Sequence, residues 1–423
     1  MMRNMASPPL NRRSFLVATG GTALMASTAA QSACAHTEPP PGTIKRADPI
    51  SPTERASRLA RLQQLMREQG IGATLIEAGA SLFYFTGVNW WRSERLTAAL
   101  IPAEGEICIV TPEFEEPSIR EMLVVPGDVR IWNEHQDPHK LVAGWIQEQK
   151  LGDRPVAIEE TVRYFAVDGL QSALPSLNLV SAAPLVSACR MIKTAPELAL
   201  LQEAADIVDT SYRSIAGKIE AGMDGQDIFM IMSAAITEHG GTAPSGGVQI
   251  NEGSALPHGS KFRETVKPGS VVLMDCGCRV DGYYADISRT FVFGEPTKKH
   301  REVYRQVRMG QEAAMMAAQI GTPAGAVDDA VRALYESLGY GPGYATPGLP
   351  HRTGHGIGLD IHEPINLVHG ERTPLAAGMC FSNEPGLYIP GSFGVRIEDC
   401  FYMSQHGPVY FTQPPNTLDA PFG

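Results

Sequence analysis

The sequence predicts an α+β protein in which a smaller N-terminal α/β part precedes a larger part made of helices and β-hairpins. Short apolar strands alternate with helical segments up to about residue 187, a long amphipathic helix follows, and two acidic hairpins lie beyond residue 270. The chain has 423 residues, of which 43% are hydrophobic and 19% charged, which is the composition of a globular protein of about two domains.

Residues 1–35 predict an export signal rather than part of the fold. Asn11-Arg12-Arg13-Ser14 is a twin-arginine pattern, an apolar run follows it to Ala30, and Ala33-Cys34-Ala35 has the form of a cleavage site. We therefore expect a protein that is exported to the periplasm. Lipoprotein anchoring at Cys34 is the alternative, but Gln31 makes a poor lipidation motif.

The N-terminal part is expected over residues 51–187, after a flexible tether at residues 36–50 that is rich in Pro, Thr and Glu. Its expected elements are a helix at 58–69, strands at 73–76 and 82–85, a hairpin with strands at 98–101 and 107–110, and a buried strand at 156–159. Strands that alternate with helical segments are typical of an α/β domain.

The second part is expected over residues 188–423 and opens with a helix from Pro196 to about Ile219. Apolar residues recur there at steps of three and four, and Thr194 is the predicted N-cap. Further helices are expected at 225–238, 298–320 and 324–338, and β-hairpins dominate from Val271 onward.

Charge and cysteine content exclude some classes of function. The formal net charge of −11 argues against nucleic-acid binding, which requires a basic surface. Beyond the N-terminal segment, no run approaches the ~20 apolar residues of a membrane span. Of the seven cysteines, six follow Cys34, and their spacing permits disulfides in an exported chain without demanding them.

The first acidic hairpin places two aspartates on one face. Asp281-Gly282 is a strong two-residue turn, and with this turn Asp275 lies opposite Ser288. Asp286 is then the diagonal neighbour of Asp275, at ~7–8 Å. A carboxylate in a central strand is costly unless it is protonated, paired or bound to a metal, so the two aspartates are candidate metal ligands.

The second acidic hairpin repeats this arrangement with glutamates. Glu384 and Glu398 stand about symmetrically around a turn near Pro390-Gly391, and Arg396 shares the face of Glu398. Four carboxylates in one pocket repel one another strongly, so cations are needed to hold them together.

Between the hairpins, the segment from His351 to Glu363 contains three histidines interleaved with glycines. The glycines allow the backbone to approach a site closely, and at least one of the histidines is expected to be a ligand. His258 is a further candidate from a neighbouring loop. Oxygen-rich ligation with one imidazole favours Mn²⁺, with Co²⁺, Zn²⁺ or Fe²⁺ as alternatives. Bridging carboxylates would let five ligands hold two divalent ions ~3.5–4 Å apart.

Together these motifs resemble the pita-bread metallopeptidases of the creatinase, prolidase and aminopeptidase P branch, over about residues 51–410. The motif set is Asp275-(x)10-Asp286, His355-Gly-Ile-Gly-Leu-Asp-Ile-His362, Asn383-Glu384-Pro385-Gly386 and Arg396-Ile-Glu398-Asp. The resemblance implies a creatinase-like N-terminal domain over 51–187 and a pita-bread catalytic domain over 188–423.

The resemblance also implies a role for each site residue. The implied metal ligands are Asp275, Asp286, His355, Glu384 and Glu398. Glu384 would also act as general base and then general acid. His258 and His362 would steady the tetrahedral intermediate. His351 and Arg396 would line the side of the pocket that receives the substrate carboxylate and proline.

The implied activity is metal-dependent peptide hydrolysis, as an Xaa-Pro dipeptidase or Xaa-Pro aminopeptidase acting on a small peptide with proline after the scissile bond. A homodimer is implied as well, because related enzymes wall the active site with the region matching Trp90-Trp91 from a partner subunit. Creatinase lacks the metal ligands, whereas all five positions are filled here. A metal-dependent lyase or non-peptide hydrolase, and a noncatalytic binding module, are the alternatives.

Overall fold

The computed structural model describes residues 44–261 and 263–422. The twin-arginine segment, Cys34 and residues 36–43 of the predicted tether lie outside these residues. The described residues belong to one compact unit, in which a six-stranded sheet occupies the N-terminal part and three smaller sheets occupy the rest.

The N-terminal sheet has the strand order β4-β3-β2-β1-β5-β6. Its strands are β1 (Ala73–Glu77), β2 (Ala98–Pro102), β3 (Ile107–Pro112), β4 (Gly127–Trp132), β5 (Val156–Ile158) and β6 (Leu179–Ser181). The helices of this part are α1 (Pro52–Glu68), α2 (Ala80–Thr86), α3 (Glu116–Met122), α4 (Pro138–Glu148), α5 (Tyr164–Ala173) and α6 (Ala183–Arg190). The predicted hairpin is confirmed as the antiparallel pair β2–β3.

Three details of this part differ from the prediction. The apolar run at 82–85 lies in helix α2 rather than in a strand, because a short apolar run has no periodicity to separate the two and glycines bound it on both sides. Residues 44–50 are not a free tether, since Ile50 is buried and Arg46 pairs with Glu203 at 2.7 Å. The boundary expected after residue 187 lies within α6, whose buried residues belong to a hydrophobic cluster shared with α7, β8 and β9.

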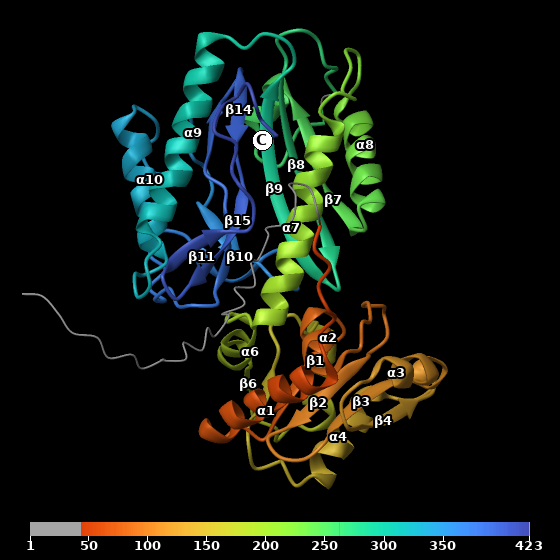
Figure 1. The fold of residues 1–423 in the computed structure, drawn as a ribbon. Coiled ribbons are helices and arrows are strands. Elements are labelled where there is room, and N and C mark those ends of the chain that lie inside the picture. The colour runs from red at the N-terminus through yellow and green to blue at the C-terminus, as the bar shows by residue number, and fades with distance from the viewer. Residues whose placement is uncertain (1–43, 262, 423) are drawn as a thin grey trace, which may run out of the picture. The chain divides into compact units, whose positions relative to one another are not determined.

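The C-terminal part has sheets in the middle and helices outside. Helices α7 (Ala195–Ile215) and α8 (Gly225–Glu238) pack against β7 (Thr242–Ile250), β8 (Val271–Val280) and β9 (Tyr283–Val292). Helices α9 (Lys298–Ala317) and α10 (Gly325–Ser337) pack on the other strands, which are β10 (Gly354–Gly356), β11 (Glu363–Leu367), β12 (Cys380–Asn383), β13 (Gly386–Ile389), β14 (Phe393–Arg396), β15 (Asp399–Ser404) and β16 (Gly407–Tyr410). Figure 1 shows the strands enclosed between the two helix pairs, as expected for a pita-bread domain.

Helix α7 begins as the sequence predicts. The side chain of Glu197 accepts a hydrogen bond from the backbone N–H of Thr194 at 2.9 Å, which completes a capping box. One face of the helix is buried against β8 and β9, and the helix ends at Ile215, four residues before the predicted end.

The strands β8 and β9 form one unbroken antiparallel ladder with Asp275 opposite Ser288, which confirms the predicted register. Asp281 and Gly282 form the turn, and both have positive φ angles, 46° and 86°. Asp286 lies opposite Gly277 and is therefore the diagonal neighbour of Asp275.

The second acidic hairpin is broken in the middle. Strand β12 pairs with β15 and β13 pairs with β14, while Glu384-Pro385 and Ile397-Glu398 lie between the two ladders. Pro385 has no N–H to donate to a ladder, so one continuous hairpin cannot pass through it. The backbone N–H of Glu384 donates instead to Thr353 O at 2.9 Å, and that of Glu398 donates to Ser288 O at 3.0 Å. The break therefore ties both glutamates to other segments.

The six cysteines of the described residues are all unpaired and buried. In the same residues, no helix combines the length and the apolar character that a membrane crossing requires.

Candidate metal centre

A cavity of about 490 Å³ lies where β8, β9, β10 and the broken hairpin meet. All nine site residues expected from the sequence line it: Asp275, Asp286, His355, Glu384, Glu398, His258, His362, His351 and Arg396. The fold thus brings together side chains that are up to 140 positions apart, from His258 to Glu398.

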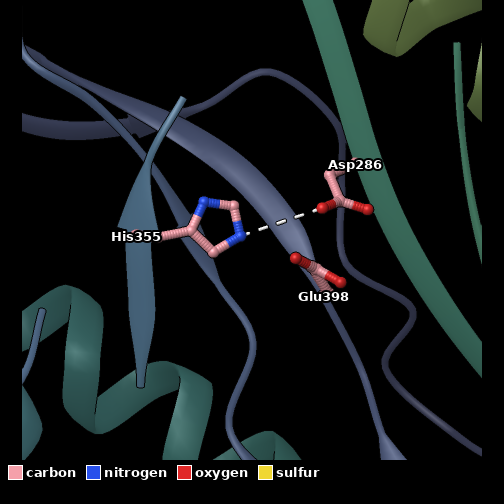
Figure 2. Close-up of side chains that lie close together, drawn as sticks. All are labelled: Asp286, His355 and Glu398. Atoms are coloured by element: carbon pink, nitrogen blue, oxygen red, sulfur yellow. Dashed lines mark ion pairs between the residues drawn. The ribbon is translucent and has the colours of Figure 1, made fainter. Parts of the chain in front are cut away.

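Three of these residues form the tightest group that could hold a metal ion. Asp286, His355 and Glu398 are buried, and each offers a ligand atom within 4.8 Å of the others (Figure 2). His355 Nε2 lies 3.8 Å from Asp286 Oδ2 and 3.5 Å from Glu384 Oε1. The spacing leaves room for an ion between the atoms, because direct hydrogen bonds would be shorter.

The imidazole of His355 is in the form that binds metals. Its Nδ1 lies 3.0 Å from the carbonyl oxygen of Gly356, so Nδ1 carries the proton and Nε2 faces the carboxylates with a free lone pair. Burial, with a smaller contribution from the neighbouring His362, lowers the pKa of His355 to about 3. The ring is therefore neutral at neutral pH.

The positive charge of Arg396 does not offset burial and mutual repulsion among the carboxylates of the cavity. Burial raises the pKa of Asp286 well above its ordinary value, and repulsion from Asp275 and Glu384 adds to the shift. Burial and repulsion from Asp286 act in the same way on the pKa of Glu398. Burial raises the pKa of Glu384 to about 7, although Arg396 opposes this shift. The chain alone does not neutralise this group of acids.

One oxygen of the group has no hydrogen-bond partner. Glu398 Oε2 lies 2.7 Å from Ser288 Oγ, but Glu398 Oε1 is buried without a donor. A buried unsatisfied acceptor costs about 1–3 kcal/mol, and more when it is charged. Carboxylate oxygens around a neutral imidazole are ligands for divalent ions, so the residues present fit the expected metal ions.

Asp275 has different surroundings from the buried group. Its side chain is 38% exposed and forms an ion pair with Arg396 Nη2 at 2.7 Å. Arg396 also donates to Ser288 Oγ at 2.9 Å and to Tyr388 Oη at 2.9 Å. Arg396 lines the cavity as expected, but its guanidinium is already engaged by the protein.

The three remaining histidines divide into two kinds. His258 and His362 are exposed to the cavity, and neither ring has a hydrogen bond in the part of the chain that the structure describes. His351 is tied at both nitrogens, since Nδ1 lies 2.7 Å from Arg352 O and Nε2 lies 2.9 Å from Tyr388 Oη. His258 and His362 are thus free to meet a substrate, whereas His351 is held in place.

Three residues of the site were missed by reasoning from the sequence. Ser288 was expected only as the residue opposite Asp275, yet its hydroxyl lies between Asp275, Glu398 and Arg396. Tyr388 joins Arg396 to His351, and no sequence pattern marked it. Arg352 lines the cavity without an ion pair among the described residues, and its place in the histidine-rich segment was the one available signal.

Buried carboxylates and a neutral imidazole, set in one cavity between helix pairs and short of positive charge, define a metallohydrolase of the pita-bread class. The comparisons place the chain within this class. Residues 199–405 match Metallopeptidase family M24, and residues 58–192 match the Creatinase/Prolidase N-terminal domain. The chain belongs to metallopeptidase family M24, and it is a metallopeptidase.

Relatives of known name cover nearly the whole described chain. The chain is 32% identical to an Xaa-Pro dipeptidase of Lactobacillus helveticus, over 85% of this chain and 98% of that protein. It is 30% identical to a putative dipeptidase, YkvY, of Bacillus subtilis, over 86% and 99%. Among solved structures, dipeptidase PepE from Mycobacterium ulcerans has a TM-score of 0.80 at 30% identity and covers 88% of this chain and 99% of its own.

These findings confirm the expected family, the fold class and the peptidase activity, and the family is dependent on a pair of metal ions. The individual roles expected for the nine cavity residues stay predictions. The metal identity, the position of proline in the substrate, the homodimer and the export route also remain to be tested.

Proposed function

We propose that this chain is an Xaa-Pro dipeptidase that works with two divalent metal ions, Mn²⁺ in the first place. The observation that carries the proposal is the buried group of carboxylates around His355, with Glu398 Oε1 unpartnered. The name of the Lactobacillus helveticus relative, an Xaa-Pro dipeptidase, supports the substrate class.

Five residues would hold the ions, namely Asp275, Asp286, His355, Glu384 and Glu398. The ions would supply Lewis acidity to the scissile carbonyl and to the attacking water. Mn²⁺ is favoured because four of the five ligands are carboxylates, and Co²⁺, Zn²⁺ and Fe²⁺ are the alternatives.

The side chains would then move protons and steady charge. Glu384 lines the cavity beside His355 and would accept a proton and pass it to the leaving nitrogen. His362 and His258 face the cavity with unengaged rings and would donate to the developing oxyanion. His351, tied to Tyr388, would support the wall on the proline side.

Substrate length is set by the cation that meets the C-terminal carboxylate. Arg396 is paired with Asp275, whereas Arg352 lines the same cavity without an ion pair in the described residues. Arg352 is therefore the guanidinium available to a free carboxylate, which a dipeptide brings close to its scissile bond. The cavity of about 490 Å³ is within the range of small-molecule sites.

The test is hydrolysis by protein that has been stripped with chelator and resupplied with Mn²⁺, Co²⁺ or Zn²⁺. Xaa-Pro dipeptides are compared with Xaa-Pro-Yaa tripeptides and with Xaa-Ala dipeptides. We expect metal to restore cleavage of the Xaa-Pro dipeptides. Preference for tripeptides would replace the dipeptidase with an aminopeptidase. Binding of about two ions per chain without cleavage of any Xaa-Pro peptide would contradict the proposal and favour a lyase or another hydrolase.

We also propose export to the periplasm by the twin-arginine route, on the strength of residues 1–35. This route carries folded proteins, and the six unpaired buried cysteines suit folding in a reducing compartment. The double variant R12K/R13K should leave the protein in the cytoplasm at full length. Its appearance at mature size in the periplasmic fraction would contradict the route.

A homodimer is the last part of the proposal. Trp91 is 69% exposed and stacks on Trp90 with ring centroids 4.7 Å apart, which gives a partner subunit an apolar surface to cover. Light scattering coupled to size exclusion should give twice the chain mass, and W91A should shift the population toward monomer. A monomer at micromolar concentration would refute the dimer.

A further inference from the structure

One cluster of charges lies outside the metal centre and has no role in the chemistry described so far. Glu363 is buried, and its carboxylate meets two cations. Arg190 Nη2 donates to Oε1, and Lys193 Nζ donates to Oε2 at 2.9 Å. The side chain of Lys193 is 2% exposed and that of Glu363 is 3% exposed.

The same carboxylate holds the loop that leads to the metal centre. Glu363 Oε1 accepts hydrogen bonds from the backbone N–H of Leu359 at 2.9 Å and of Asp360 at 3.2 Å. The loop is shaped around this group, because a Cβ atom on Gly358 would lie 2.6 Å from Oε1. The backbone of Glu363 also pairs with Gly356, the residue after His355.

His362 directly precedes Glu363 and has few contacts of its own. Its ring touches the ring of His355 edge-on, with centroids 4.3 Å apart, and makes no hydrogen bond in the described part of the chain. The direction in which His362 points therefore depends on its backbone, and Glu363 fixes that backbone.

The two cations come from the connector between the N-terminal and C-terminal parts. Arg190 is the last residue of α6, and Lys193 lies two residues before the start of α7. Arg190 Nη1 donates to Ser81 Oγ at 2.9 Å, and Ser81 Oγ donates to Glu159 Oε1 at 2.9 Å. A continuous set of hydrogen bonds thus runs from the N-terminal sheet through the connector to Glu363.

Buried ion pairs of this kind are a poor source of stability, because the desolvation of each charge offsets the attraction. What the cluster provides is a fixed geometry at the loop that precedes β11. We propose that Glu363 is a positioning residue that aims His362 into the active-site cavity, and that Arg190 and Lys193 hold Glu363 in place for this purpose. The inference rests on the role proposed for His362.

A double-mutant cycle tests the link to His362. E363Q alone should lower kcat about tenfold or more with little change in KM, as is typical when a residue that orients a catalytic group is lost. H362A should lower kcat by about 10²-fold or more. In the H362A background, E363Q should cause no further loss. Losses that multiply in the double variant would overturn the proposal, because Glu363 would then act independently of His362.

Amide hydrogen exchange gives a second measurement that needs no substrate. E363Q should speed exchange in a peptide covering residues 357–367, since an uncharged amide oxygen accepts more weakly from Leu359 and Asp360 and loses the ion pairs that hold the side chain. The control is E203Q, which alters a buried glutamate that also binds an arginine and a backbone N–H, Arg46 and Ala47, away from the loop. E203Q should leave both kcat and exchange in this peptide unchanged. Unchanged exchange in E363Q would also overturn the proposal.

Two further arms keep the outcomes distinct. If E363Q fails to fold, K193M removes one of the two cations and should give the same effects in weaker form. Metal content per chain is measured in every variant and should remain that of the wild type, which separates loop positioning from metal loss. Failure of the wild type to cut Xaa-Pro peptides would contradict the proposed function, while the exchange measurement would still decide the role of Glu363.

Discussion

Glu363 and Glu398 are both buried glutamates of the C-terminal part, but their surroundings differ. Despite burial, Arg190 and Lys193 lower the pKa of Glu363 to about 2. Burial and the acids Asp286 and Glu384 raise the pKa of Glu398. Two cations of the chain donate directly to Glu363, whereas the one ion pair of Glu398 in the described residues is with Arg396 at 3.9 Å, and it does not offset burial and the neighbouring acids. Burial alone therefore does not identify a metal-binding carboxylate. A buried carboxylate whose negative charge is not offset by cations of the chain indicates a metal site.

The largest expected effect lies on the metal side of this comparison. Glu384→Gln should reduce turnover at least about a thousandfold with the fold intact, because it removes both a ligand and the group that handles the proton. Steady-state kinetics and circular dichroism measure the two quantities. Turnover near the wild-type rate would remove Glu384 from the mechanism.

The sharpest test of the comparison is the sign of the change in unfolding free energy that two matched substitutions cause in metal-free protein. Glu363→Gln should lower the free energy of unfolding by about 3–5 kcal/mol, because the buried Lys193 loses its ion-pair partner and Arg190 keeps only that with Asp360. Glu398→Gln should raise it, because a buried and repelled charge disappears. Denaturant unfolding after chelation measures both. The comparison fails if both variants shift stability in the same direction.

The pH dependence of the stability of metal-free protein follows from the same pKa shifts. The folded-state pKa of Glu363, about 2, is below its unfolded value of about 4.3, so its stabilising contribution is lost as the pH falls from about 4.3 toward 2. The folded-state pKa of Glu384, about 7, is above the unfolded value, so stability is lost as the pH rises from about 4.3 through 7.

Melting temperatures of chelated protein between pH 3 and pH 8 should therefore pass through a maximum. Saturating Mn²⁺ should remove the fall toward pH 7, since it neutralises the acids of the cavity. A melting temperature that rises steadily to pH 8 without metal would show that ionisation of the cavity acids does not destabilise the fold.

The smallest effect concerns a neutral group that borders the site. Tyr388→Phe removes the hydroxyl that accepts from Arg396 and lies 2.9 Å from His351 Nε2. We expect a loss of about 1.5–3 kcal/mol in stability and a modest rise in KM, because one of the two lost hydrogen bonds is to the charged guanidinium of Arg396. The KM of Tyr388→Phe is compared with that of H351A, which should rise by a similar factor. Similar values would indicate that Tyr388 and His351 act on the same wall of the cavity, the one on the proline side.

The parts of the site that could be predicted are those with regular local geometry. The register of β8 and β9 follows from the turn at Asp281-Gly282, and it correctly placed Asp275 and Asp286 on one face. The second hairpin was only half predictable. Its two glutamates were found, but the break at Pro385 was not, because a long-range bond from Glu384 to Thr353 replaces the ladder there.

Two other features could not be read from the sequence. Strand β7 was missed because its stretch, with Gly246 and Gly247, has neither alternation nor a strong apolar run. The ion cluster at Glu363 joins residues 170 or more positions apart, and no local pattern reports such a contact. Long-range charge pairing depends on the completed fold, whereas hairpin register depends on a few neighbouring residues.

The position of Arg190 and Lys193 has a consequence for exchanging segments between relatives. A chimaera that takes its N-terminal segment from another family member and joins it after residue 187 would bring in only part of helix α6 and split its contacts. A junction after Thr194 would transfer Arg190 together with Ser81, which it contacts directly, and with Glu159, which it reaches through Ser81. The contacts of Arg190 and Lys193 with Glu363 would then cross the junction. Recombination points in this family can therefore be chosen so that contacting side chains come from the same parent protein, rather than at the end of a domain match.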